Sequence, residues 1–175
     1  MDPIIEATID ALRSVSHIRL FSSERGYQGR LFCALQAALD DHGILNDELI
    51  LEMEYQKSPR RHQIGQRPDI ILHVPTEISG AAVYENNYAV WALKLQGSPA
   101  RAREDFDKLD EMFEHLGYPL GFFINIDSDA HHLRCYTGQY SNRLLAFAVR
   151  LNNGNVSIKQ AQWIDNQVIE AEYID

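Results

Sequence analysis

The chain has few of the residues and segments that mark several protein classes. Its 175 residues include only two cysteines, whose number and spacing fit neither a disulfide framework nor a zinc site. No apolar run approaches the roughly 20 residues that cross a bilayer, and the Met-Asp-Pro start lacks the pattern of a signal peptide. We therefore expect a cytoplasmic protein without a membrane partner, in which Cys33 and Cys135 are reduced packing residues.

Positive charge is also scarce. The chain has 16 Lys and Arg against 25 Asp and Glu, a formal net charge of −9. Because phosphates are bound mainly by Lys and Arg, this balance argues against a protein that coats nucleic acid without specificity. One local exception is the segment KSPRRHQIGQR, which holds Lys57, Arg60, Arg61 and Arg67. It fits either a solvated loop or a patch that binds phosphates.

Several catalytic patterns are missing as well. There is no Gly-rich phosphate loop and no Ser-His-Asp order that stands out. His73, His131 and His132 lack a third ligand at metal spacing, so we interpret the two adjacent histidines as an incidental surface pair. We find no internal repeat, low-complexity segment or linker, and the length favours one domain over residues 1–175.

The hydrophobic pattern predicts alternating helices and strands. Apolar residues at helical spacing predict helices over residues 3–14, from Ser22-Ser23 to Gly43, and over 100–116. Alternation or short apolar runs predict strands over 48–55, 67–74, 89–96, 119–127 and 131–138, with a loop over 76–87. Residues 141–153 fit a helix or a strand, and residues 156–174 fit one or two strands with a turn at Asp165-Asn166.

This order of elements predicts an α/β fold, with a mixed central β-sheet flanked by helices. The strand 89–96, the helix 100–116 and the strand 119–127 form a β-α-β crossover, which makes the two strands parallel. Ligand sites on such sheets lie at the ends of the central strands.

Two apolar strands each contain one charged residue. Strand alternation places Asp69 with Ile71 on one face, and Ala92, Lys94 and Gln96 together on one face of the second strand. If the two strands are neighbours, Asp69 and Lys94 can meet. Burying a charge is costly, so the pair is either a structural ion pair or part of a functional site.

These residues resemble the motif of the PD-(D/E)XK nuclease superfamily, which has the restriction-endonuclease-like fold. The likeness rests on Pro68-Asp69, on Lys94 in the next apolar strand, and on the amphipathic helix that follows a Gly-Ser-Pro break. It covers a core of about residues 24–127 and leaves both termini unexplained.

The resemblance implies a Mg²⁺-dependent or Mn²⁺-dependent nuclease that acts on DNA, alone, as a homodimer or in a larger nuclease complex. By position, Asp69, residue 92 and the backbone carbonyl of Leu93 would hold the metal. Lys94 would orient the attacking water or stabilise charge on the phosphate. It leaves open whether the setting is bacterial defence against phage, repair or a mobile element.

Position 92 departs from the motif, because it holds alanine where the family has a carboxylate. Three explanations are open. Ala92 is a deliberate substitution that disables the enzyme; the carboxylate has moved to the following helix, where Asp107 lies beside Glu104 and Asp105; or the chain is a natural pseudo-nuclease that binds without cutting. The first explanation predicts an impaired enzyme, and the third a module that binds nucleic acid or protein.

Three further residues are candidates for the site. Glu24 at the head of the second helix matches a position from which family members add an acid, or it is a simple helix-dipole carboxylate. Glu54, with Glu52 on the same strand face, is a candidate acid near the metal, although such a face is usually wet. Gln96 shares the face of Lys94 and could contact the phosphate.

The basic segment generates the first prediction. Replacing Arg60 and Arg61 with alanine should weaken DNA binding and lower the slope of log affinity against log salt by about two, since each neutralised phosphate contributes about 0.9. Fluorescence anisotropy over a salt series measures this slope. An unchanged slope would show that the segment is only a solvated connection.

Overall fold

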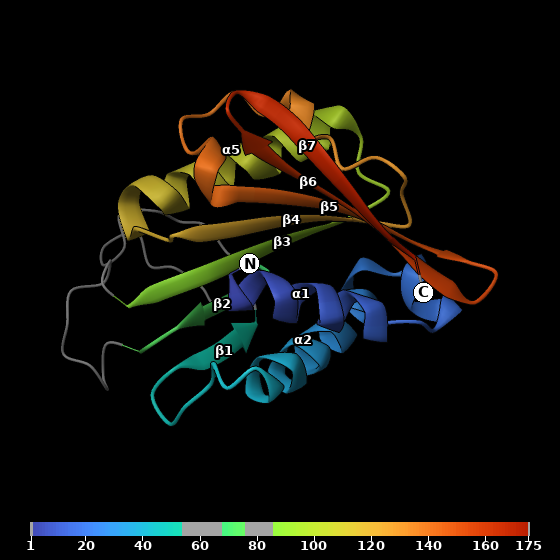
Figure 1. Cartoon of the computed structure of the whole chain (residues 1–175), viewed down its shortest axis with the longest axis horizontal. Helices are drawn as coiled ribbons and strands as arrows, with labels where there is room; N and C mark the ends of the chain where they lie inside the picture. The colour runs from blue at the N-terminus through green and yellow to red at the C-terminus, as the bar shows by residue number, and fades with distance from the viewer. Residues whose placement is uncertain (1, 54–67, 76–85, 175) are drawn as a thin grey trace.

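A computed structural model describes residues 2–53, 68–75 and 86–174 (Figure 1). Its helices are α1 (Pro3–Ser14), α2 (Glu24–Asp41) and α5 (Pro99–Leu116), with short 3-10 turns at Ile18–Ser22, Leu133–Cys135 and Ser141–Arg143. Its strands are β1 (Ile50–Met53), β2 (Ile70–His73), β3 (Asn87–Leu95), β4 (Leu120–Ile126), β5 (Leu144–Asn152), β6 (Asn155–Ile164) and β7 (Gln167–Ile174). The predicted helices 3–14 and 100–116 are confirmed within one residue.

The strands form one sheet in the order β1-β2-β3-β4-β5-β6-β7. Strands β3, β4 and β5 run parallel, and the remaining neighbours pair antiparallel. The mixed sheet flanked by helices is therefore confirmed, as is the parallel crossover from β3 through α5 to β4. The last two strands form the predicted hairpin, whose turn residues Asp165 and Asn166 have φ of 49° and 61°, values that suit a type I′ turn.

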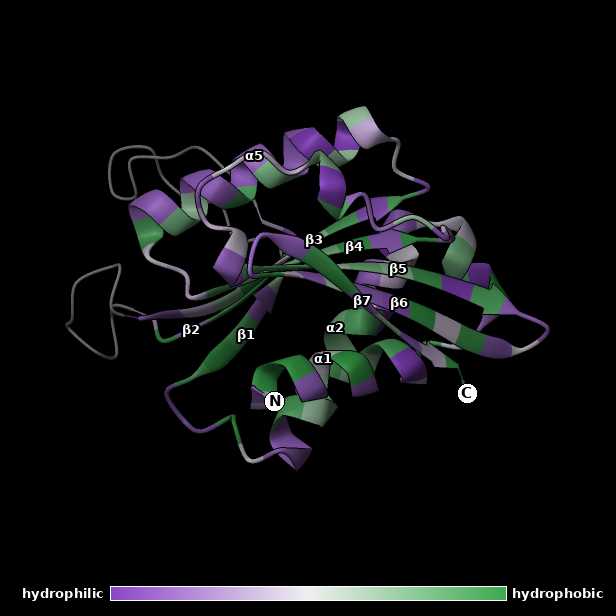
Figure 2. Ribbon diagram, turned by 45° about the horizontal axis from the view of Figure 1, so that its top comes forward, coloured by the Kyte–Doolittle hydropathy of each residue, from purple (hydrophilic) through white to green (hydrophobic). Residues whose placement is uncertain are grey.

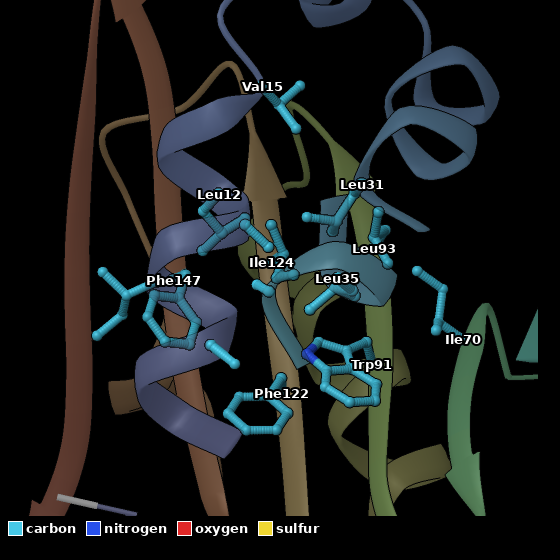
Figure 3. Packing of buried hydrophobic residues seen from close by; sticks show 14 of the residues in the cluster. Leu12, Val15, Leu31, Leu35, Ile70, Trp91, Leu93, Phe122, Ile124 and Phe147 are labelled. Carbon is cyan, nitrogen blue, oxygen red and sulfur yellow. The ribbon is translucent and has the colours of Figure 1, made fainter. Parts of the chain in front are cut away.

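Helices cover both faces of the sheet. Figure 1 shows α1 and α2 on one face and α5 on the other, and Figure 2 shows apolar and polar residues alternating along α5. Trp91 and Phe122 stack at 5.1 Å in the larger core, which packs against α1 and α2 (Figure 3). Phe106 and Phe123 make an edge contact at 4.9 Å in the second core, beneath α5. The sheet is thus buried on both faces at its centre.

Capping residues set the ends of the helices. Asp2 and Ser23 accept hydrogen bonds from backbone N–H groups at the starts of α1 and α2, and Ser98 does the same for α5. Gly43 and Gly117 follow the last turns of α2 and α5 with φ of 67° and 68°, the left-handed conformation that glycine adopts without strain. The helix end predicted at Gly43 is confirmed, and Gly117 follows directly on the predicted helix 100–116.

Three expectations from the sequence are wrong or are now decided. The segment 131–138 is not a strand: His132 has φ of 56° and Leu133–Cys135 form a 3-10 turn. No strand can enter there because β5, formed by part of the ambiguous segment 141–153, pairs directly with β4. Cys33 is exposed and Cys135 half-buried, so neither is a core packing residue, and both are free thiols.

Among the described residues, no helix is long and apolar enough to span a bilayer.

The close contact between α5 and β4 generates a stability prediction. A Cβ at Gly121 would lie 2.7 Å from Cε1 of Phe113, which is a core side chain. Gly121→Ala should therefore lower the free energy of unfolding by about 1–3 kcal/mol. Gly29, in the middle of α2, has nothing within 4 Å of such a Cβ, and Gly29→Ala should raise stability by up to about 1 kcal/mol. Urea denaturation of both variants checks the pair; equal shifts would contradict it.

Candidate functional site

The candidate site lies where β3 continues past the first residue of its antiparallel neighbour β2. That first residue, Ile70, pairs with Trp91, and β3 has no partner in β2 after this pair. The next N–H groups on that side of β3 belong to Leu93 and Leu95. Leu93 N donates to Asp69 Oδ2 at 2.7 Å, and Leu95 N donates to Glu24 Oε2 at 2.8 Å. Two carboxylates thus accept the hydrogen bonds that a longer β2 would accept from this part of β3.

Helix α2 positions both carboxylates. Ser23 caps the helix and so places Glu24 in its first turn. One turn later, the buried Gln28 donates from Nε2 to the backbone oxygen of Asp69 at 3.0 Å. The dipole at the helix start favours the negative charge of Glu24, so Glu24 is both a helix-start carboxylate and a member of the cluster.

Lys94 points at carboxylates from two helices. Its Nζ lies 3.4 Å from Asp105 Oδ2 on α5 and 4.0 Å from Glu24 Oε1 on α2. The strands β2 and β3 are neighbours, as the expected contact between Lys94 and Asp69 requires. That contact is not a direct ion pair, because Lys94 pairs with carboxylates of the two helices instead. Its positive charge acts on Asp69 at longer range and lowers the pKa of that carboxyl.

The acid that α5 contributes is Asp105, and not Asp107. The side chain of Asp105 is 7% exposed, whereas Glu104 and Asp107 are exposed on the outer face of the helix. A signal for this lay in the sequence. Asp105 follows Ala102 by three residues and precedes Leu109 by four, which places a carboxylate within the apolar stripe of α5.

A small cavity of about 80 Å³ joins these groups, and its lining includes Pro68, Asp69, Ala92, Lys94, Asp105 and Lys108. It has room for several water molecules. The methyl group of Ala92 leaves space where a longer side chain would reach. Asp105 Oδ2 is buried yet makes no hydrogen bond, while Asp105 Oδ1 accepts one from Lys108 Nζ at 2.7 Å. Lys108 is a site residue that the sequence pattern did not reveal.

Burial dominates the electrostatics of Asp69. It raises the pKa of this carboxyl to about 6, and the nearby charges of Glu24 and Asp105 add to the rise. The hydrogen bond from Leu93 N and the charge of Lys94 act in the opposite direction. For Lys108, partial burial alone would lower the pKa, but the hydrogen bond and charge of Asp105 outweigh it and raise the pKa.

Other candidates lie elsewhere. Gln96 follows the end of β3 with φ of 47° and donates to Asp127 at 2.7 Å, so the structure does not bring it into the cluster. Glu52 pairs with His73 at 2.6 Å, toward the other end of β2. Glu54 and the basic residues Lys57, Arg60, Arg61 and Arg67 lie outside the described residues.

The adjacent histidines are not a surface pair. His131 is buried, and its Nε2 lies 3.3 Å from Glu170. His132 Nε2 is 2.8 Å from the backbone oxygen of Gly97. Over residues 2–53, 68–75 and 86–174, no group of three or more His, Cys, Asp or Glu side chains is placed to hold a metal ion.

A buried asparagine supports the end of β3. Asn125 accepts from Gly97 N at 2.7 Å and donates to the backbone oxygen of Ala130 at 2.7 Å. Gly97 must be small here, because a Cβ at this position would lie 2.7 Å from Cγ of Lys94. Asn125 therefore fixes the turn that joins Lys94 to α5, a role that its apolar sequence context did not reveal.

No family model, curated protein or solved structure matches the chain. Any function assigned to the chain therefore rests on the geometry of its site.

The raised pKa of Asp69 generates a prediction about stability and pH. The folded protein holds this proton more tightly than the unfolded chain, so the free energy of unfolding should fall as pH rises between about 4 and 6. Without divalent cations, Asp69→Asn should match the parent at pH 4 and exceed its stability at pH 7.5 by up to about 3 kcal/mol. Urea denaturation over this pH range, with Asp107→Asn as control, measures the difference. A constant offset between parent and Asp69→Asn would contradict the prediction.

Proposed function

We propose that this protein is a metal-dependent nuclease that hydrolyses phosphodiester bonds in DNA, with its site between Asp69, Asp105 and Lys94. The observation that carries the proposal is the Asp105 carboxylate, which reaches the cavity beside Ala92 and leaves one buried oxygen without a hydrogen bond. The Lys94 ammonium lies 3.4 Å from this oxygen without making a hydrogen bond, so the buried charge of Asp105 is only partly compensated, which is costly. A cation bound beside it would remove that cost.

The residues fit a hard divalent cation. Mg²⁺ is commonly held by one or two carboxylates, with waters and substrate phosphates as its remaining ligands. Asp69 and Asp105 supply the two carboxylates here, and the carbonyl of Leu93 faces the same side of β3 as the N–H that Asp69 binds. When bound, the ion would offset phosphate charge and make water more acidic.

The chain's own residues supply the rest of the chemistry. The oxygen of a water molecule forms a bond to phosphorus while the bond from phosphorus to one ester oxygen breaks. One proton leaves the water, and the departing ester oxygen gains one. Lys94, 23% exposed and held by Asp105 and Glu24, orients the water or stabilises the negative charge that builds on the phosphate.

This proposal selects one of the three explanations for Ala92. A carboxylate supplied by α5 makes an acid at position 92 unnecessary, so the chain is expected to be active as it stands. The support is specific to Asp105, because Asp107 is exposed on the same helix.

A second candidate function rests on the charge balance. Each Asp105 oxygen faces a different lysine, at 3.4 Å for Lys94 and 2.7 Å for Lys108. Ammonium groups that neutralise a carboxylate compete with a cation for it. If they prevail, the chain is a module that binds nucleic acid or protein without cutting.

The test removes the carboxylate from position 105 on α5 and then supplies one at position 92 on β3. Asp105→Asn should reduce Mg²⁺-dependent cleavage of supercoiled plasmid at least about 100-fold, as expected when a metal-site group is lost, whereas Asp107→Asn should leave cleavage unchanged. Adding Ala92→Glu to Asp105→Asn should restore part of the activity, since the cavity receives a carboxylate from β3 instead.

Three outcomes separate the explanations. Loss and rescue together support the proposal. Activity that appears only in Ala92→Glu, with Asp105 intact, would show that the chain is a disabled enzyme. If every variant binds DNA and none cuts it, the binding module is correct.

A further inference from the structure

Lys108 lines the cavity with a half-exposed side chain and belongs to no part of the proposed chemistry. It follows Asp105 by three residues on α5, and its Nζ donates to Asp105 Oδ1 at 2.7 Å. Its side chain is 48% exposed, against 7% for Asp105 and 23% for Lys94. The ammonium of Lys108 therefore lies between the buried carboxylate and the solvent from which a substrate would approach.

The two lysines differ in what holds them. Lys94 lies near both Asp105 and Glu24, and Gly97 packs closely against its stem. Among the described residues, Asp105 is the single carboxylate within 4.0 Å of Lys108 Nζ. A long, flexible lysine side chain at a half-exposed helix position can turn to a new partner at small cost.

We infer that Lys108 binds a phosphate oxygen of the substrate, and that Asp105 holds its ammonium until a divalent cation takes that carboxylate. This inference rests on the proposed function. Without a cation, the negative charge of Asp105 satisfies Lys108. A cation beside Oδ2 offsets the negative charge of the whole carboxylate and so weakens the hold of Oδ1 on Lys108. Lys108 keeps its own charge, and a phosphate oxygen is the anion that the reaction brings to this cavity.

The arrangement couples two binding events. A cation that frees Lys108 raises the affinity for DNA, and DNA raises the affinity for the cation by the same factor, because coupling free energies are reciprocal. A plain helical ion pair between Asp105 and Lys108 predicts no such effect.

The test measures binding, without cleavage. Fluorescence anisotropy of a labelled DNA duplex gives affinities over a salt series, in EDTA and in Ca²⁺, for the parent and for Lys108→Gln. In Ca²⁺ the variant should lose about 8-fold in affinity near 0.1 M salt, and its slope of log affinity against log salt should fall by about 0.9, the value of one phosphate contact. In EDTA the two proteins should bind alike.

Two controls accompany this variant. Lys108→Arg keeps the charge and should keep the gain in Ca²⁺. Lys159→Gln removes a lysine from a separate pocket lined by His131 and Glu170 and should change nothing. Circular dichroism verifies that each variant is folded.

The outcomes are distinct from those of the proposed function. Equal salt slopes for parent and Lys108→Gln in Ca²⁺ would overturn the inference, as would an equal loss in EDTA, which would mean that Lys108 is never held back. In both cases a parent that cleaves DNA with Mg²⁺ leaves the nuclease proposal intact. Calorimetry that finds no binding of Ca²⁺ or Mn²⁺ to the parent would remove both.

Discussion

The whole site depends on the late start of β2. Because β2 begins only at Ile70, opposite Trp91, while β3 continues to Leu95, two N–H groups of β3 have no strand partner. Buried backbone donors must be satisfied, and here the side chains of Asp69 and Glu24 satisfy them. A requirement of the backbone therefore brings two carboxylates to one edge, and the rest of the cluster assembles around them.

The cluster costs the fold stability. Three carboxylates and two ammonium groups lie together at the edge of a sheet that is buried at its centre, and burial dominates the raised pKa of Asp69. Partial compensation comes from hydrogen bonds to the backbone and from Lys94. Residues whose pKa is shifted by burial and by specific charged neighbours concentrate at functional sites. A structural ion pair does not need a cavity, and this cluster encloses one.

Helix α5 combines two roles that are usually separate. Its apolar stripe, with Phe106, Leu109 and Phe113, covers one face of the sheet and joins two parallel strands. The same stripe carries Asp105. This residue lies three positions after Ala102 and four before Leu109, a spacing that places all three on the face of the helix that packs against the sheet. The turn before the helix is fixed by Asn125, so the position of Asp105 relative to Lys94 follows from packing.

Much of the architecture follows from local chemistry that the sequence shows directly. A cap at Ser23, the break at Gly97-Ser98-Pro99, glycine stops at residues 43 and 117, and apolar periodicity predict the helices and most strands. Strand alternation places Asp69 and Lys94 on their faces. Two things needed tertiary structure. The segment 131–138 looks like a strand because Leu133 and Cys135 alternate with polar residues, but β5 already occupies the edge of β4.

The choice of ion-pair partners was the second feature that needed the tertiary structure. The sequence by itself determined which charged residues lie in apolar segments: Asp69 and Lys94 in strands, and Asp105 in a helical stripe. It did not determine that Lys94 pairs with Asp105 and Glu24, or that Lys108 closes the cavity. The contacts of Lys94 join a strand to two separate helices, and only the packing of both helices against the sheet brings these side chains within about 4 Å, because spacing along one element sets no distance to another.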